Sequence, residues 1–293
     1  MYTVSLGDYL NTRHVSLDER SHISLFDKLE VLAAARRMVR DLAFDVAEVP
    51  LVTYLVARQA NVPLTALPVF PNRALPHFLM YGPAGRPVHP RELNGARIGT
   101  RAYTVTSGVW GRVVLQDELG LDLDTITWIT SGEEHVQGLD LPPNVKVEPG
   151  LLLANELAAG RLDAVVGTNL DSALHAGVRR LFADPAESGR AWLRSGRPYP
   201  VNHTVVVRDE VLRDDPDYVA ELYAALVQAH DLSRPERVDQ AERRFGTGVE
   251  ADYPHEYGWA HNRPAVGFLA DAARRQSILS DGSTDDLFWS DDG

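Results

Sequence analysis

The regular alternation of helix patterns and strand patterns limits the fold of this chain more than any other feature. Apolar residues are spaced for a helix over residues 26–42 and for a buried strand over residues 44–49. From Gly95 the alternation starts again, with a strand pattern over residues 96–100 and a helix pattern over residues 106–119. Strands that alternate with helices are typical of α/β folds with mostly parallel strands. The sequence therefore predicts an α/β protein.

The restart at Gly95 divides the chain into two regions of similar build. The 293 residues are enough for about two domains. A proline-rich stretch precedes a β-branched strand pattern near Pro198, which indicates that the chain returns there to the first region. We therefore expect two α/β lobes, the first formed by residues 1–94 and 198–293 and the second by residues 95–197.

The composition argues against several classes of partner. A net charge of −12 does not favour nucleic acid or anionic membrane surfaces. No apolar run approaches the roughly 20 residues of a membrane span. The N-terminus has neither the basic segment nor the apolar segment of a secretory signal, so we expect a cytoplasmic protein.

The residue inventory also limits the chemistry. The absence of cysteine rules out disulfides, iron–sulfur clusters and a cysteine nucleophile. The two lysines, Lys28 and Lys146, lie in a helix pattern and in a short polar strand pattern, which does not favour a Schiff-base lysine. Neither a GxxxxGK nor a GxGxxG loop occurs, so nucleotide binding by those loops is unsupported. We expect a protein that works with its own side chains and no cofactor.

The stretch from Gly99 to Gly120 combines a strand end, a polar loop and a helix start. The first backbone N–H groups of a helix have no partner within the helix, and together with the helix dipole they attract anions. Arg101 can add a bidentate contact to a carboxylate, and Gly108 allows a close approach. The hydroxyl groups that can donate to a ligand here are those of Thr104, Thr106 and Ser107. The alternative is ordinary helix capping by these hydroxyls, with Arg101 solvated.

Polar side chains also accompany other strand patterns. They are Asp8, Tyr9, Thr12 and Arg13 after the first strand, Asn72, Arg73 and His77 between two later strands, and Asn202 and His203 at the start of the returning strand. Each of these residues alone is ordinary for a loop. Because ligands of open α/β sheets gather at the carboxyl ends of strands, together they predict a positively charged cleft. The natural ligand of such a cleft is a small anionic molecule.

Several stretches, in order along the chain, carry a resemblance to a known family. They include GDYLNTR, RRMVRDLAFDVAEVPLVTYL, PVFPNRALPHFLMYG, GARIGTRAYTVTSGVWGRVVLQDELGLD, TWITSGEEHV, LAAGRLDAVVG, YPVNHTVVVR and EYGWAHNRPAVGFL, and they cover most of the chain. This series resembles the 4,5-dihydroxyphthalate decarboxylase family. The chain departs from the family pattern just before the loop that contains Thr104, at TNLDSALHAG and within DYPHEYGWAHNR, which leaves the substrate open.

The resemblance implies a cytoplasmic enzyme with the two-lobe type II fold of periplasmic solute-binding proteins and a cleft between its lobes. It also implies the nonoxidative loss of CO₂ from a hydroxylated aromatic carboxylate similar to 4,5-dihydroxyphthalate. A phenol ortho or para to the carboxylate can push electron density onto the ring carbon, which a general acid then protonates. This chemistry needs neither a redox cofactor nor a nucleophile.

These expectations assign roles to the polar residues. We expect Arg73 and Arg101 to bind carboxylates, aided by Thr104, Thr106 and Ser107. His77 and His203 are candidates for proton transfer, since histidine titrates near neutral pH, and we expect them to converge from the first lobe. Asp8, Glu48 and Tyr9 are candidates to orient or deprotonate the phenols. Arg13 and Asn202 complete the expected substrate-binding set.

Several alternatives stay open. A solute-binding or sensor protein on the same fold would bind a small aromatic carboxylate and would need no acid–base pair. Another lyase of the same clan, of the menaquinone-pathway type, would act on a different substrate. A divalent metal bound by histidines and carboxylates is compatible with the sequence, although no HExxH-like spacing supports it. A homo-oligomer is compatible as well.

Overall fold

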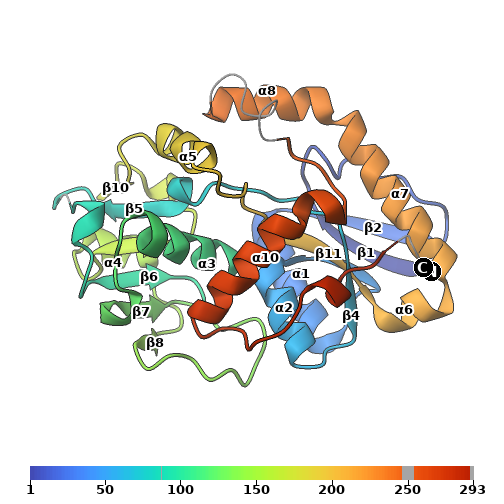
Figure 1. Ribbon diagram of the computed structural model, residues 1–293, viewed down its shortest axis with the longest axis horizontal. Helices are drawn as coiled ribbons and strands as arrows, with labels where there is room; N and C mark the ends of the chain where they lie inside the picture. Colours follow the sequence, from blue (N-terminus) through green and yellow to red (C-terminus); the bar gives the residue numbers. More distant parts are fainter. Residues whose placement is uncertain (87, 246–253, 291–293) are drawn as a thin grey trace. The chain divides into compact units, whose positions relative to one another are not determined.

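The computed structural model describes residues 1–86, 88–245 and 254–290, which form two compact units (Figure 1). The first unit contains residues 1–73, 201–270 and 281–293, and the second contains residues 74–200 and 271–280.

The sheet of the first unit mixes parallel and antiparallel pairs. Its strands, in spatial order, are β2 (Ser21–Phe26), β1 (Tyr2–Gly7), β3 (Val46–Pro50), β11 (His203–Arg208) and β4 (Leu64–Leu67). β1 pairs in parallel with both β2 and β3, whereas β11 is antiparallel to β3 and β4. The returning strand β11 therefore inserts between two strands from the N-terminal part of the chain.

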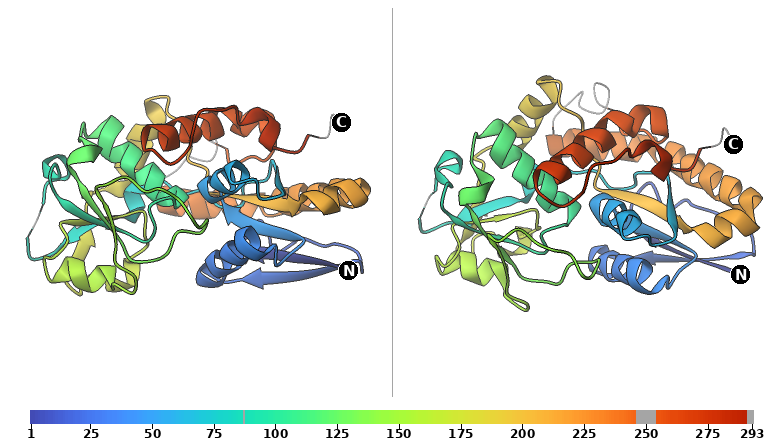
Figure 2. Two further views of the ribbon diagram at one scale, coloured as in Figure 1. Left: turned by 90° about the horizontal axis from the view of Figure 1, so that it is seen from below. Right: turned by 60° about the horizontal axis from the view of Figure 1, so that its bottom comes forward.

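Helices and short helical turns complete the first unit. They are α1 (Lys28–Asp41), α2 (Leu51–Gln59), α6 (Asp209–Asp214), α7 (Pro216–Leu232), α8 (Arg234–Phe245), the first turns of α10 (Trp259–Arg275) and η6 (Asp285–Leu287). Both α1 and α2 pack on strands of the sheet (Figure 2). Apolar residues of α7, among them Leu222 and Leu226, share a buried cluster with Val4, Val46 and Val205. Burial of this apolar surface is the main favourable contribution to the stability of the unit.

The second unit has its own sheet. Its strands, in spatial order, are β10 (Val178–Arg180), β5 (Met80–Pro83), β9 (Ala164–Val166), β6 (Arg97–Thr100), β7 (Thr127–Thr130) and β8 (Val145–Val147). β9, β6, β7 and β8 are parallel to one another, and β5 and β10 are antiparallel additions at one side.

The helical elements of the second unit pack on this sheet or beside it. They are α3 (Thr106–Val113), which continues as a π-helical turn (Val114–Glu118), α4 (Leu153–Ala158), α5 (Pro185–Arg194), the last turn of α10, and the 3₁₀ turns η1 (Pro76–Leu79), η2 (Pro90–Glu92), η4 (Leu123–Thr125) and η5 (Asp171–Ala173). Gly111 of α3 lies against β9, since a Cβ there would come within 2.2 Å of Val166 Cγ1. The side chains of Leu153 and Leu157 from α4 share an apolar cluster with Ile129 and Val165.

The observed boundaries differ from the expected lobes in three places, the shortest of which is residues 198–200, which the sequence assigns to the first lobe and the structure to the second unit. Residues 74–94, expected in the first lobe, belong to the second unit because β5 pairs with β9 and β10 there. Residues 271–280 also belong to the second unit, because the end of α10 continues into it. His77 lies in the turn η1, and β5 begins after it at Met80.

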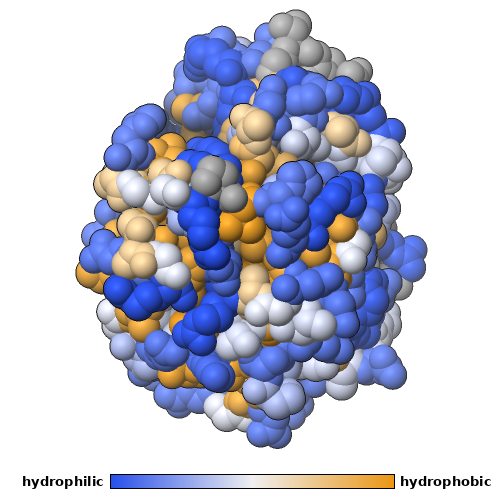
Figure 3. Space-filling model, turned by 90° about the vertical axis from the view of Figure 1, so that its left-hand side faces the viewer, coloured by the Kyte–Doolittle hydropathy of each residue, from blue (hydrophilic) through white to orange (hydrophobic). Residues whose placement is uncertain are grey.

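On the face shown in Figure 3, hydrophilic residues cover most of the surface, and hydrophobic residues form a band between them. Among the described residues, the exposed large hydrophobic side chains are those of Met1, Leu25, Leu29, Val147, Leu152 and Leu232. Within the same residues, no helix combines the length and the apolar character that crossing a bilayer requires.

Candidate active site

A buried carboxylate, that of Glu48, organises the polar end of the sheet in the first unit. Glu48 Oε1 accepts hydrogen bonds from the Tyr9 hydroxyl at 3.0 Å and from His203 Nδ1 at 2.5 Å. Its other oxygen, Oε2, accepts from the backbone N–H of Gly7 at 2.9 Å. Three donors from two segments, the end of β1 with its following loop and the start of β11, therefore compensate the burial of one carboxylate, as buried charges require.

The register of the strands brings Glu48 and His203 together. Val205 of β11 lies directly opposite Glu48 of β3, and His203 is two residues before Val205. Because side chains alternate between the faces of a strand, His203 and Val205 share a face, and Glu48 is their neighbour across the ladder. With Nδ1 donating to the carboxylate, the second ring nitrogen, Nε2, is left as the group that can exchange a proton.

The loop after β1 folds back so that Tyr9 reaches Glu48. A Cβ on Gly7 would lie 2.4 Å from Tyr9 Cε2, so only glycine leaves room for this ring. The Thr12 hydroxyl fixes the loop by donating to the Gly7 carbonyl at 2.5 Å. Burial, and then the nearby Glu48 charge, raise the pKa of Tyr9 far above its usual value. Tyr9 is therefore a hydrogen-bond donor to Glu48 and not a base at neutral pH.

Asparagines from two loops surround this cluster. Asn72 Nδ2 donates to the Tyr9 hydroxyl at 3.3 Å, and the backbone carbonyl of Asn72 accepts from the Asn202 N–H at 2.9 Å. Arg73 donates to the side-chain oxygen of Asn262 from α10. The structure thus brings together the predicted residues Tyr9, Glu48, Asn202 and His203. Arg73 directly follows Asn72 in the chain.

Two other predicted residues pair with each other at the surface. Arg13 Nε donates to Asp8 Oδ1 at 2.6 Å, and both side chains are about half exposed. The Arg13 guanidinium lowers the pKa of the Asp8 carboxyl. Neither residue contacts Glu48 or His203, so this ion pair does not join the cluster.

In the second unit, the loop after β6 already holds a carboxylate, that of Glu134. Its Oε1 accepts from the Tyr103 N–H at 2.5 Å, and its Oε2 accepts from the Thr104 N–H at 2.9 Å and from the Thr104 hydroxyl at 2.5 Å. The loop therefore has the donors expected of a carboxylate site. Nothing in the contacts of Thr104 supports plain helix capping, since the cap residue of α3 is Val105 and no side chain caps that helix.

The start of α3 contacts a neighbouring loop. The Ser107 hydroxyl donates to the Gly167 carbonyl at 2.6 Å, and a Cβ on Gly167 would lie 2.5 Å from the Gly108 nitrogen. The close approach that Gly108 permits is therefore to the chain itself. Thr106 is buried at the first position of the helix, and Arg101 is partly exposed two residues before Tyr103.

The second predicted histidine, His77, belongs to the second unit and not to the unit of His203. Its Nε2 lies 2.9 Å from Glu118 Oε2, and its ring contacts Phe182 and Trp192 edge-on. The expectation that both histidines come from one lobe is therefore wrong. The reason is that β5, which follows the turn of His77 in the chain, pairs with β9 in the second sheet.

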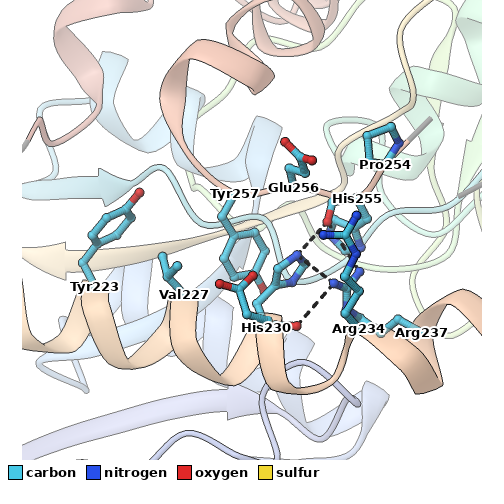
Figure 4. A pocket seen from close by; sticks show the side chains of 10 residues that line it. Tyr223, Val227, His230, Arg234, Arg237, Pro254, His255, Glu256 and Tyr257 are labelled. Atoms are coloured by element: carbon cyan, nitrogen blue, oxygen red, sulfur yellow. Dashed lines mark hydrogen bonds between the residues drawn. The ribbon is translucent and has the colours of Figure 1, made fainter. Parts of the chain in front are cut away.

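A cavity of about 190 Å³ beside the end of α7 contains two further histidines (Figure 4). His230 stacks on Tyr257, with ring centroids 3.9 Å apart, and its Nε2 lies 2.6 Å from the His255 carbonyl. Burial, followed by the charge of Arg237, lowers the pKa of His230 to about 3. Burial also holds the pKa of His255 well below its usual value. Both imidazoles are neutral at neutral pH, so neither is a general acid there.

Sequence reasoning does not identify two residues that shape the second unit, Glu134 and Arg112. Glu134 follows β7 as the other polar residues follow their strands, so the same strand-end rule would have found it. Arg112 lies between Val109 and Val113 in an apolar helix pattern, which is a sign of a buried cation. Among the described residues, no group of three or more His, Asp and Glu side chains is arranged to hold a metal ion.

Two solved structures with a similar fold are a ligand-binding component of an import system and an alkanesulfonate-binding protein. The ligand-binding component of an ABC-type import system from Staphylococcus aureus, solved with zinc bound, matches with a TM-score of 0.58 and 12% identity over 98% of this chain and 96% of that chain. The alkanesulfonate-binding protein SsuA from Xanthomonas axonopodis pv. citri, bound to MOPS, matches with a TM-score of 0.56 and 15% identity over 96% and 94% of the two chains. The chain has the two-lobe type II fold of periplasmic solute-binding proteins, as predicted.

The sequence relatives define the family within that fold. A 4,5-dihydroxyphthalate decarboxylase from Comamonas testosteroni is 33% identical over 211 residues, which are 68% of this chain and 63% of that protein. A 4,5-dihydroxyphthalate decarboxylase from Pseudomonas putida is 31% identical over 210 residues, which are 66% of this chain and 81% of that protein. No protein-family model matches the chain. The chain belongs to the 4,5-dihydroxyphthalate decarboxylase family, and the alignment spans just under two thirds of the Comamonas relative.

Proposed function

We propose that this protein is a nonoxidative decarboxylase that removes CO₂ from a hydroxylated aromatic carboxylate, 4,5-dihydroxyphthalate or a close analogue. The observation that carries the proposal is the cluster of Glu48, His203 and Tyr9. A buried carboxylate fixes one nitrogen of an imidazole and leaves the other for proton transfer. Family membership supplies the substrate class. As the resemblance implies, we place this activity in the cytoplasm.

The proposed reaction uses His203 as the general acid. In the substrate, each carboxylate is para to a hydroxyl group. As that hydroxyl gives its proton to solvent, its electron pair moves into the ring, and the protonated His203 delivers a proton from Nε2 to the carbon that bears the carboxylate. The bond between this carbon and the carboxylate then breaks, its electrons restore the aromatic ring, and CO₂ leaves. The phenolate oxygen and His203 each take back one proton from solvent. The net change is the replacement of CO₂ by one proton, without oxidation or reduction.

Glu48 and Tyr9 support this step indirectly, through the hydrogen bonds that join Glu48 to His203 and Tyr9 to Glu48. The 2.5 Å hydrogen bond to the Glu48 carboxylate orients the ring of His203 and fixes its tautomer. Tyr9 and the Gly7 N–H hold the carboxylate in place. The proposal assigns Arg73 and Arg101 to substrate carboxylates, because guanidinium groups bind them bidentately. A proton transfer of this kind requires no redox cofactor.

The test is turnover of a panel of hydroxylated phthalates and hydroxybenzoates, with CO₂ release as the readout. We expect 4,5-dihydroxyphthalate or a close analogue to release CO₂, and phthalate without hydroxyl groups to release none, because it cannot supply the electron pair. His203→Asn is the matched control, since its side-chain amide can still donate to Glu48. If members of the panel stabilise the protein against heat but none is turned over, the proposal fails and the protein is a binder of aromatic carboxylates.

A further inference from the structure

The Glu134 carboxylate is bound in the second unit as a ligand carboxylate would be. It accepts two backbone N–H groups, from Tyr103 and Thr104, and the hydroxyl of Thr104. Tyr103 and Thr104 are both buried, while Glu134 is only partly so. Charge-assisted hydrogen bonds of this kind are about twice as strong as neutral ones. The loop is therefore a formed carboxylate site with an occupant from its own chain.

A buried cation behind the loop favours a carboxylate in this position. Arg112 is fully buried, and its Nη2 donates to the Tyr103 carbonyl at 2.5 Å. Its Nε donates to Gln276 Oε1 at 2.7 Å, and its guanidinium lies 4.0 Å from the centre of the Tyr103 ring. Burial lowers the pKa of Arg112 to about 10, so the group is still charged at neutral pH. The loop is held from one side by this cation and presents its N–H groups to the carboxylate.

We propose that Glu134 is a specificity-determining residue that competes with ligand carboxylates for the donors of Tyr103 and Thr104. The inference rests on the proposed function in taking an aromatic carboxylate as the ligand. A ligand carboxylate can reach these donors only when Glu134 leaves them, so the apparent affinity is reduced by the fraction of molecules in which Glu134 is bound. A ligand carboxylate that approaches while Glu134 stays in place is repelled by the negative charge of Glu134. The donors of Tyr103 and Thr104 are then already hydrogen-bonded to Glu134.

The consequence is a graded selection among anions. A ligand that offers a weak acceptor, such as a phenol or an amide, does not displace Glu134. A ligand with a carboxylate does so at a cost in affinity. Removing the negative charge at residue 134 should therefore strengthen carboxylate binding, which is opposite to the effect expected if Glu134 only stabilises the loop.

The experiment measures calorimetric binding of phthalate, which has both carboxylates and no hydroxyl groups and so cannot react by the proposed route. For Glu134→Gln we expect binding to tighten about tenfold, because a neutral amide holds the loop less strongly than a carboxylate. For Glu134→Asp, which keeps the charge but is one methylene shorter, we expect a smaller tightening. Glu133→Gln is the matched control for a general loss of negative charge, with a change below about twofold at physiological salt because the Glu133 side chain is exposed and exposed charges are screened.

The direction of the change decides the outcome. Tighter binding by Glu134→Gln than by both the unaltered protein and Glu133→Gln supports the proposal. Weaker or unchanged binding in a variant with an unaltered unfolding temperature overturns it and makes Glu134 a structural clamp. If Glu134→Gln does not fold, the Glu134→Asp result decides in the same way. Absence of phthalate binding to every form also overturns it, whereas the proposed decarboxylase activity fails only if the hydroxylated panel releases no CO₂.

Discussion

The pair of His203 with Glu48 and the pair of His77 with Glu118 have the same chemistry but opposite exposure. In the first unit the carboxylate of Glu48 is fully buried and the His203 side chain is 13% exposed. In the second unit the His77 side chain is 0% exposed and that of Glu118 is 24% exposed. In the first pair the imidazole is the more exposed group, and in the second pair the carboxylate is the more exposed group.

From this difference we propose a functional role for the first pair and a structural role for the second. Proton transfer requires a ring nitrogen within hydrogen-bond reach of the substrate. His203 can meet that condition with Nε2. His77 is enclosed by Phe182 and Trp192, and its Nδ1 is buried without a hydrogen-bond partner among the described residues. We therefore favour His203 over His77 as the proton donor, although both have a glutamate partner.

Replacement of His203 should have the largest effect on activity. His203→Asn removes the titrating nitrogen but keeps a donor for Glu48, so we expect turnover to fall by roughly 10²–10⁴-fold. Ligand affinity and the unfolding temperature should change little. Steady-state CO₂ release, with calorimetric binding of phthalate as the control, checks both statements. Near-normal turnover in the variant would remove His203 from the mechanism.

Loss of the Glu48 charge should have the next largest effect. Glu48→Gln keeps the shape of the side chain but no longer offers a carboxylate that orients His203 and fixes its tautomer. We expect turnover to fall by about 10- to 100-fold, as is typical when the partner that orients a functional histidine is removed. The measurement is the ratio of kcat in the two proteins at saturating substrate. A loss larger than that of His203→Asn would mean that Glu48 itself contacts the substrate.

Replacement of His77 should affect stability instead of activity. His77→Ala leaves a space between two aromatic rings and removes the partner of Glu118, so we expect a loss of about 1–3 kcal/mol in the free energy of unfolding. The turnover of the folded variant should stay within a few-fold of normal. Urea unfolding and CO₂ release test the two parts separately. A large loss of turnover in a fully folded variant would break the distinction between the two pairs.

His230 extends the comparison to a buried histidine that has no carboxylate partner among the residues that the structure describes. Its folded pKa, about 3, lies below the ordinary histidine value of about 6.5, so the unfolded chain binds the proton more readily. The stability that neutral His230 provides is therefore complete above about pH 6.5 and is lost as the pH falls toward 3.

The corresponding variant should flatten the acid side of the stability profile. His230→Gln does not titrate, and its amide can still donate to the His255 carbonyl. We expect the slope of unfolding free energy against pH between about pH 6 and 4 to decrease by at most about 1.4 kcal/mol per pH unit. Urea unfolding at several pH values measures this slope. An unchanged slope would show that His230 is not the residue that titrates on unfolding.

The α/β character of the chain could be predicted from its sequence because periodicity is a local property. The patterns behind α1, β3, β6 and α3 are contained within fewer than 20 consecutive residues each, and the structure has these elements close to the predicted positions. The same holds for the strand that His203 begins. The family resemblance also comes from the residues alone, and the curated relatives confirm it.

The assignment of segments to units could not be predicted in the same way. β5 has an ordinary strand sequence, and its place in the second sheet depends on pairing with β9, more than 80 residues later. Such pairing is decided by the sum of many distant contacts and leaves no local pattern. For this reason residues 74–94 and His77 fall in the second unit.

The candidate site shows the same division. Sequence by itself determined the residue types at the strand ends, among them Tyr9, His203 and Thr104, and the charge and hydrogen-bonding capacity that go with them. Tertiary structure alone decided that the buried Glu48 would take three donors, that Asp8 would pair with Arg13 at the surface, and that Glu134 would occupy the N–H groups of Tyr103 and Thr104. The physical reason is that almost every residue type has the same backbone donor, and burial is not a property of a residue type. Which donors bond to a given carboxylate, and which groups are buried, is therefore decided only when distant segments pack together.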